Sequence, residues 1–217
     1  PDLWSATPLR VRSFLELTCV LGKRGPADVL HEALAKIECA GAETSRLGLS
    51  PHAPYSVTPA LLELTAAAAM EKGLATTIHI AESEEERDMF MRRRGPMFDW
   101  LKTRRNMSDC GAGSPVELLE QHGLLRSRPL AVHANYLAPG DPGLLVRRNV
   151  SVAHCPRSHA FFGHAAFPFK KLAAAGGNVC LGTDSLASVQ PVRGQNLSLD
   201  MFAEMALFAR RHPAVPP

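Results

Sequence analysis

The stretch Leu74-Ala-Thr-Thr-Ile-His-Ile-Ala-Glu82 decides the fold, because the other chemically suggestive segments can be placed relative to it. Ala75 to Ile80 is a short apolar and β-branched run, which predicts a strand buried on both faces. His79 lies near the end of this run, and Glu82 follows three residues later. An imidazole and a carboxylate are therefore expected at the carboxyl end of a parallel strand, the edge where α/β barrels place their chemistry.

Strands and helices alternate six times along the chain without an antiparallel hairpin, which predicts a parallel sheet with right-handed crossovers. A Rossmann-type sheet is disfavoured, because no G-x-G-x-x-G opens a helix after a strand. The predicted strands are 14–21, 46–50, 75–80, 129–132, 150–153 and 178–181. The predicted helices are 26–39, 58–73, 84–94, 97–103, 114–123, 141–148, 168–175 and 198–211, and residues 157–167 are predicted to form a loop.

Composition indicates one α/β domain over residues 1–217. With 46% hydrophobic residues, a chain of 217 residues can bury one substantial core. The net charge is only +3, and the basic clusters at 92–94 and 104–105 lack interleaved aromatic residues. They favour a solvated helix face over a nucleic-acid interface. Because the chain begins at Pro1 and ends in a proline-rich segment, we expect a fragment cut at both ends.

The cysteine pattern and hydropathy indicate a cytoplasmic protein. The five cysteines have no Cys-x-x-Cys spacing, and several lie within apolar segments, as is typical of reduced, buried thiols. No apolar run approaches membrane-spanning length, and the N-terminus shows no signal-peptide pattern. We therefore expect no membrane partner.

Five polar residues lie at or just after the ends of predicted strands: His52, His79, His133, His154 and Asp184. A single histidine in such a position is more often a hydrogen-bonded structural residue than a ligand. In a parallel barrel, however, all five would converge on one mouth. Their equivalent positions therefore favour a functional site.

The segments around these residues resemble, in order, the second part of an amidohydrolase-superfamily deaminase. The matching motifs are Ser-Pro-His52-Ala-Pro-Tyr, Ile-His79-Ile-Ala-Glu82, Val-His133-Ala-Asn-Tyr, Ala-His154-Cys-Pro and Leu-Gly-Thr-Asp184-Ser. The nearest branch includes the adenosylhomocysteine, methylthioadenosine and aminofutalosine deaminases and the triazine chlorohydrolases. The resemblance implies a (β/α)₈ TIM barrel with one divalent metal ion, zinc more than iron. In that family the metal is held by a His-x-His after strand one, a His after strand five and an Asp after strand eight.

By this resemblance His79 is similar to the fifth-strand metal ligand and Asp184 to the eighth-strand ligand. No His-x-His occurs in the sequence, so the six predicted units match barrel strands three to eight. The first two strands, and any flanking β-sandwich, are expected outside this chain. Since three or four ligands are the norm, we expect the chain alone to bind metal weakly and to be inactive.

The resemblance also implies catalytic roles for three residues. A divalent cation lowers the pKa of a bound water enough to supply hydroxide, and Asp184 would take the proton from that water. Glu82 resembles the proton shuttle that donates to the ring nitrogen of the substrate, with charge compensation at a helix N-terminus as the alternative. His133 resembles the residue that orients the water or polarises the leaving group. For His154, catalytic and structural roles stay open.

Substrate contacts are expected from His52, and from Arg157 or His159 if the small-molecule substrate carries a carboxylate. A salt bridge that holds the loop is the alternative for Arg157. The expected reaction is hydrolytic deamination of an adenine nucleoside derivative of the adenosylhomocysteine, methylthioadenosine or aminofutalosine type. A chlorohydrolase and a non-catalytic, degenerate barrel fragment are the alternatives. An incomplete barrel would also expose apolar surface, which allows a homo-oligomer.

The segment 83–128 is longer than one crossover helix requires. An insertion of this kind at an active-site edge is either a substrate-shaping loop or decoration, and the sequence leaves both open.

Overall fold

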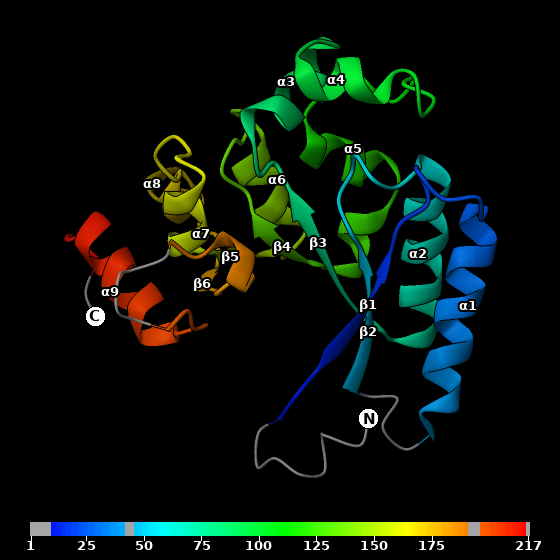
Figure 1. The fold of residues 1–217 in the computed structure, drawn as a ribbon, viewed down its shortest axis with the longest axis horizontal. Helices are drawn as coiled ribbons and strands as arrows, with labels where there is room; N and C mark the ends of the chain where they lie inside the picture. Colours follow the sequence, from blue (N-terminus) through cyan, green and yellow to red (C-terminus); the bar gives the residue numbers. More distant parts are fainter. Residues whose placement is uncertain (1–9, 42–45, 191–195, 216–217) are drawn as a thin grey trace.

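Six parallel strands, arranged in chain order, form the single sheet of the structure (Figure 1). The computed structural model describes residues 10–41, 46–190 and 196–215, so the first nine residues of the predicted domain lie outside it. Each strand pairs in parallel with the next along the chain. The strands are β1 (Ser13–Leu17), β2 (Leu47–Pro51), β3 (Ala75–Ile80), β4 (Leu130–His133), β5 (Ser151–His154) and β6 (Val179–Leu181).

Helices fill the connections between strands, as parallel pairing requires. α1 and α2 pack side by side against the first two strands (Figure 1). No helix in the described ranges is long and apolar enough to cross a lipid bilayer. The helices are α1 (Pro26–Cys39), α2 (Pro59–Lys72), α3 (Glu84–Arg92), α4 (Pro96–Leu101), α5 (Pro115–Gln121), α6 (Asp141–Arg147), α7 (Pro156–Phe161), α8 (Phe169–Ala174) and α9 (Met201–Arg211), with 3₁₀ turns at η2 (Leu124–Ser127) and η3 (Leu186–Ser188).

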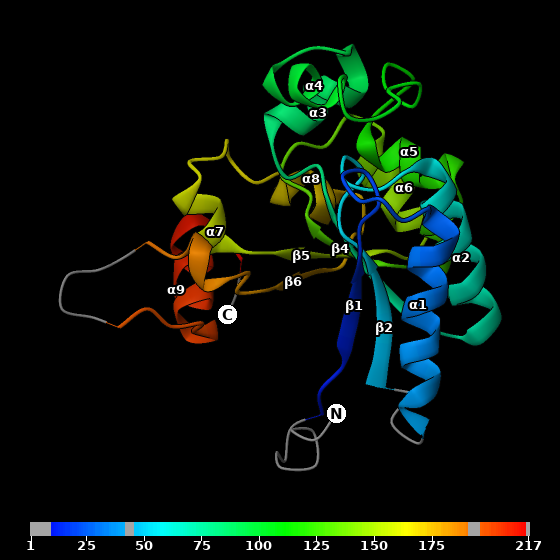
Figure 2. The same cartoon turned by 45° about the vertical axis from the view of Figure 1, so that its right-hand side comes forward.

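The sheet is curved but open among the described residues (Figure 2). β1 pairs there only with β2, and β6 pairs only with β5. The six predicted strands are all present in the predicted order, which confirms the α/β architecture. The sheet therefore has the form of a barrel wall that stops after six strands.

Helix α2 illustrates how local sequence sets the boundaries. The Thr58 side chain accepts a hydrogen bond from the Leu61 N–H, and Pro59 occupies the first helical position, where its missing N–H is tolerated. Gly73 ends the helix in the left-handed conformation at φ 65°, which glycine adopts without a steric penalty. Both predicted helix boundaries are confirmed to within one residue.

The predicted loop at 157–167 is wrong in its first part, because α7 begins at Pro156 and continues to Phe161. The proline again stands in the first helical turn, which is a start signal for a helix. A helix of six residues is too short to show a 3.6-residue period in the sequence. The remainder of the segment, up to α8, is irregular.

The expectation that β3 is buried on both faces is also wrong. Its burial alternates, with Ile78 and Ile80 fully buried on one face and Thr77 and His79 partly exposed on the other. The buried face joins the main hydrophobic core. The other face carries His79, whose ring lies next to the rings of His52 and His133.

Gly48, in the middle of β2, lies where three strands approach closely. A Cβ added there would stand 2.6 Å from the Ala75 carbonyl oxygen and 2.7 Å from the ring of Phe14. We expect Gly48→Ala to lower the free energy of unfolding by about 1–3 kcal/mol, because backbone and an aromatic ring must shift. The midpoint of guanidinium chloride unfolding measures this change.

Gly140→Ala is the matched control, since nothing lies within 4 Å of a Cβ at that position. Its backbone is right-handed, at φ −82°, so alanine fits without strain. Equal unfolding midpoints for the two variants would contradict the close approach at Gly48.

Candidate active site

The strand ends place four of the predicted polar residues along one edge of the sheet. His52 follows β2, His79 is the penultimate residue of β3, His133 ends β4, and Asp184 lies three residues after β6. The His79 ring lies between the other two, with its centroid 5.1 Å from that of His52 and 5.4 Å from that of His133. The pKa of Asp184 is affected by the charges of both His79 and His133. The three histidine rings therefore form one row, and Asp184 lies within electrostatic range of two of them.

The orientation of His79 is fixed through its backbone neighbour. Its Nδ1–H donates to the His52 carbonyl oxygen at 2.8 Å, and its backbone N–H donates to the same oxygen at 3.0 Å. Because Nδ1 carries the proton, Nε2 keeps the lone pair. A hydrogen bond of this kind is the usual outer contact of a metal-ligating histidine, since it sets the tautomer and the ring direction.

Asp184 is held as an oriented carboxylate. Its Oδ2 accepts hydrogen bonds from the Ser158 hydroxyl at 2.6 Å and the Ser188 hydroxyl at 2.7 Å. Burial acts to raise the pKa of Asp184, but the two hydroxyls and the nearby histidines hold that pKa below its ordinary value. The carboxylate is therefore ionised at neutral pH, and neither of these bonds uses Oδ1.

His79 Nε2 and Asp184 Oδ1 fit the donor types that zinc accepts. Each belongs to a side chain whose other polar atom is already hydrogen bonded, which is the outer support that metal ligands normally have. Within the described residues, no three His, Cys, Asp or Glu side chains gather closely enough to hold an ion. The residues present thus fit part of a metal site.

Glu82 lies beside His133 at the wall of a cavity of about 540 Å³. Its Oε1 is 3.6 Å from His133 Nε2, which is too far for a hydrogen bond. Burial raises the pKa of Glu82, and Asp184 raises it further against the opposing effect of His79. Burial and the charge of His79 lower the pKa of His133 to about 4. At neutral pH the imidazole is therefore uncharged.

The backbone of Glu82 is held on both sides. Its N–H donates to Glu86 Oε2 at 2.9 Å, and its carbonyl accepts from the Asn135 side-chain amide at 3.0 Å. Glu86 is fully buried at the first turn of α3, where the Ser83 hydroxyl accepts a hydrogen bond from its N–H. The structure thus adds Glu86 and Asn135 to the predicted site residues, as positioning groups for Glu82.

The sequence predicts only part of the contact between Glu86 and the backbone of Glu82. Ser83 and Glu86 have the spacing of a capping box, in which the glutamate normally bonds to the N-cap N–H. Here the carboxylate reaches one residue further back, to Glu82. Ala81, just before Glu82, has a left-handed backbone at φ 47°. Because alanine seldom adopts this conformation, the sequence gives no signal for it.

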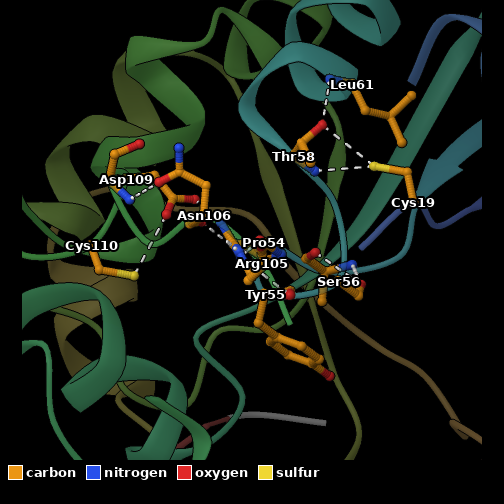
Figure 3. A network of polar contacts seen from close by, with 12 residues as sticks. Cys19, Pro54, Tyr55, Ser56, Thr58, Leu61, Arg105, Asn106, Asp109 and Cys110 are labelled. Carbon is orange, nitrogen blue, oxygen red and sulfur yellow. Dashed lines mark hydrogen bonds and ion pairs between the residues drawn. The ribbon is translucent and has the colours of Figure 1, made fainter. Parts of the chain in front are cut away.

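The loop that carries His52 is fixed by the long insertion. His52 Nδ1 and the Ser56 hydroxyl share a hydrogen bond of 2.7 Å. Figure 3 shows the Arg105 guanidinium donating to the carbonyls of Pro54 and Tyr55, each at 3.2 Å. Arg105 forms a buried ion pair with Asp109. The insertion therefore supports this loop, and Tyr55 lines the Glu82 cavity.

Arg157 and His159 belong to α7, which packs against α9 (Figures 1 and 2). The Arg157 guanidinium donates to the Ser198 carbonyl at 2.9 Å and lies 3.8 Å from the buried Glu204 carboxylate. That pairing is the contact the salt-bridge alternative requires. Both ring nitrogens of His159 are also hydrogen bonded, to Ala165 and Arg211.

His154 packs as a buried residue. Its ring stacks on Phe167 with centroids 3.7 Å apart and planes at 10°. Burial lowers its pKa to about 3, so it is neutral. These contacts are those of a packing residue, while its Nδ1 has no hydrogen-bond partner among the described residues.

The curved parallel sheet and its polar edge place the chain among the TIM-barrel deaminases by fold. The zinc-bound adenosine deaminase from Xanthomonas campestris superposes with a TM-score of 0.76 at 23% identity, covering 98% of this chain and 44% of that one. Residues 24–216 match the Amidohydrolase family, and the chain belongs to it. The predicted family and the predicted incomplete barrel are both confirmed.

Two curated relatives are each 35% identical to this chain. One is the 5′-deoxyadenosine deaminase of Methanoregula boonei, aligned over 78% of this chain and 34% of its own length. The other is the aminodeoxyfutalosine deaminase of Deinococcus radiodurans, aligned over 79% of this chain and 42% of its own length. The chain thus spans between a third and a half of these relatives.

The buried carboxyl of Glu86 makes stability depend on pH. Burial raises the pKa of Glu86 to about 8, whereas an unfolded glutamate titrates near 4.3. Between these values the unfolded state has lost a proton that the folded state keeps, so stability falls as pH rises from about 5 to about 8. We expect Glu86→Gln to remove this fall and to be more stable than the parent at pH 8 by on the order of 3 kcal/mol. Chemical unfolding over this pH range measures the difference.

Glu117→Gln is the control, because Glu117 makes a similar bond to the Ser114 N–H at the start of α5 but is not buried. It should leave the pH dependence of stability unchanged. Parallel stability curves for Glu86→Gln and the parent would contradict the prediction.

Proposed function

We propose that the full-length protein is a metal-dependent hydrolytic deaminase of an adenine nucleoside derivative, with zinc as the metal more than iron. The observation that carries this proposal is the position of Glu82, half-buried beside a neutral His133 and within the electrostatic influence of His79 and Asp184. Membership of the Amidohydrolase family and the names of the two 35% identical relatives support it. The cavity beside Glu82, of about 540 Å³, is large enough for a nucleoside.

His79 Nε2 and Asp184 are the residues that would hold the metal, with further ligands from outside the described residues. When bound, a divalent cation supplies hydroxide by lowering the pKa of a water. The proposed role of Asp184 is to take the proton from that water. The hydroxyls of Ser158 and Ser188 keep its carboxylate ionised and oriented for this transfer.

Glu82 is proposed to donate a proton to the ring nitrogen next to the carbon under attack. Its raised pKa suits this role, because general acids work best when their pKa lies near the operating pH. His133, neutral and buried, is proposed to orient the attacking water and to accept a hydrogen bond from it. His52 is proposed to contact the substrate. Arg157 and His159 stay candidates for a contact with a substrate carboxylate.

The proposed reaction is tested by following ammonia release from the full-length protein loaded with zinc or iron. 5′-Deoxyadenosine, methylthioadenosine, adenosylhomocysteine and aminodeoxyfutalosine form the substrate panel. Glu82→Gln should lower kcat by about 10²–10⁴-fold, the usual contribution of a general acid, with KM nearly unchanged. Removal of metal by a chelator should abolish ammonia release, and added zinc should restore it.

Glu71→Gln is the control, since this exposed glutamate near the end of α2 does not line the cavity of Glu82. Its kcat should equal that of the parent. Chloride released from chlorinated triazines in place of ammonia would favour the chlorohydrolase alternative. A metal-loaded protein inactive on every substrate would favour the degenerate fragment.

A further inference from the structure

A second cavity, of about 310 Å³, lies between α7, the segment before α8 and the end of α9. α7 and α9 lie side by side in both views (Figures 1 and 2). We name this cavity the His–Arg pocket. Apart from Ala166, its lining consists of His154, His159, His164, Phe167, Arg211 and His212.

Arg211 provides the positive charge of the His–Arg pocket. The side chains of His154 and His159 are neutral at neutral pH, because burial lowers their pKa values to about 3 and about 4. His159 Nε2–H donates to the Ala165 carbonyl at 2.8 Å, so its Nδ1 accepts from Arg211 Nη1 at 3.0 Å. This bond uses one of the five guanidinium N–H groups. No carboxylate belongs to the described lining, and none of the described carboxylates forms an ion pair with Arg211.

Two buried nitrogens of the His–Arg pocket have no partner among the described residues: His154 Nδ1 and His164 Nε2. Buried polar atoms are nearly always hydrogen bonded, so both nitrogens are available to a water or to a ligand that enters the pocket. The side chain of His154 is 1% exposed and stacks on Phe167, which makes one side of the pocket aromatic. The pocket thus combines one guanidinium, unused imidazole nitrogens and a flat apolar surface.

The His–Arg pocket adjoins the cavity of Glu82. His164 lines both cavities, and Tyr136, which lines the Glu82 cavity, has its hydroxyl 3.4 Å from His164 Nδ1. The charges of His159 and His164 also affect the pKa of His133. His164 is therefore the residue at which the two cavities meet.

We propose that the His–Arg pocket binds a carboxylate at the far end of the substrate, with Arg211 as its ion-pair partner. This inference rests on the proposed deaminase function, and it narrows the substrate class. The preferred substrate is then an adenine nucleoside whose 5′ substituent ends in a carboxylate, as in aminodeoxyfutalosine, over an uncharged one such as 5′-deoxyadenosine. Sequence identity does not indicate which of these two substrates is preferred, because the relatives named for each are both 35% identical to the chain.

Arg157 is the competing cation, and its contacts weigh against it. Its backbone N–H and guanidinium both face Glu204, at 2.8 Å and 3.8 Å, so a carboxylate within the protein already partners it. Arg157 also does not line the His–Arg pocket. Among the described residues Arg211 is hydrogen bonded only to His159 and has no carboxylate partner, so its other N–H groups can bind a substrate carboxylate.

The test compares Arg211→Gln with the parent in the metal-loaded, full-length protein, using aminodeoxyfutalosine and 5′-deoxyadenosine. Loss of a charged hydrogen bond should lower kcat/KM for aminodeoxyfutalosine by at least about tenfold. The value for 5′-deoxyadenosine should stay within about twofold of the parent value. Arg211→Lys should recover part of the loss. Arg210 lies one residue earlier on α9 and outside the pocket. Arg210→Gln should therefore leave kcat/KM unchanged for both substrates.

A binding measurement separates failure of this inference from failure of the proposed function. Benzoate, followed by ligand-observed NMR, should bind the parent and Arg210→Gln but not Arg211→Gln, whether or not the protein deaminates anything. In kinetics, benzoate should compete with aminodeoxyfutalosine. Benzoate that binds at Arg211 without competing would indicate a separate acid-binding site and would overturn the assignment to the substrate.

Three further results would overturn the inference. They are equal loss of kcat/KM on both substrates in Arg211→Gln, unchanged benzoate binding in that variant, and a loss selective for aminodeoxyfutalosine in Arg157→Ala instead. Absence of ammonia from every substrate with the parent would refute the proposed function and leave the benzoate comparison to decide the site.

Discussion

The arrangement of the candidate site depends on hydrogen bonds between the segments that follow β3 and β4. Three consecutive carbonyls, those of Ile80, Ala81 and Glu82, accept from Ala134 N–H, Tyr136 N–H and the Asn135 amide, at 2.9 to 3.0 Å. These bonds continue the parallel pairing beyond the ends of the strands. They fix the position of Glu82 relative to His133, which a flexible loop could not do.

That arrangement requires unusual backbone conformations. Ala81, His133, Ala134 and Asp184 all have φ between 47° and 72°, a region that non-glycine residues seldom occupy. Such conformations persist only where surrounding contacts determine them, and they cluster at functional sites. Here the determining contacts are visible: the bonds between the two segments hold Ala81 and Ala134, and the serine hydroxyls hold the Asp184 side chain.

The sequence predicts the parts of this structure that follow from strand ends. A buried run followed by a polar residue predicts where His79, His133 and Asp184 lie, because parallel strands all end at one edge. Contacts made by short or distant segments have no such signal. α7 is too short to show a period, and the contact of Arg211 with His159 joins residues 52 positions apart. Periodicity alone assigns Arg211 to the last turn of an amphipathic helix, where a basic residue needs no further explanation.

Burial acts in opposite directions on the two groups that face each other at the candidate site. It raises the pKa of the Glu82 carboxyl and lowers that of the His133 imidazole to about 4, because each group loses hydration of its charged form. Burial thus favours the uncharged form of each group, the protonated carboxyl and the unprotonated ring. These are the forms that the proposed mechanism uses, in which Glu82 donates a proton and His133 accepts a hydrogen bond. The same desolvation that orders the site thus favours the carboxyl as the acid and the imidazole as the acceptor.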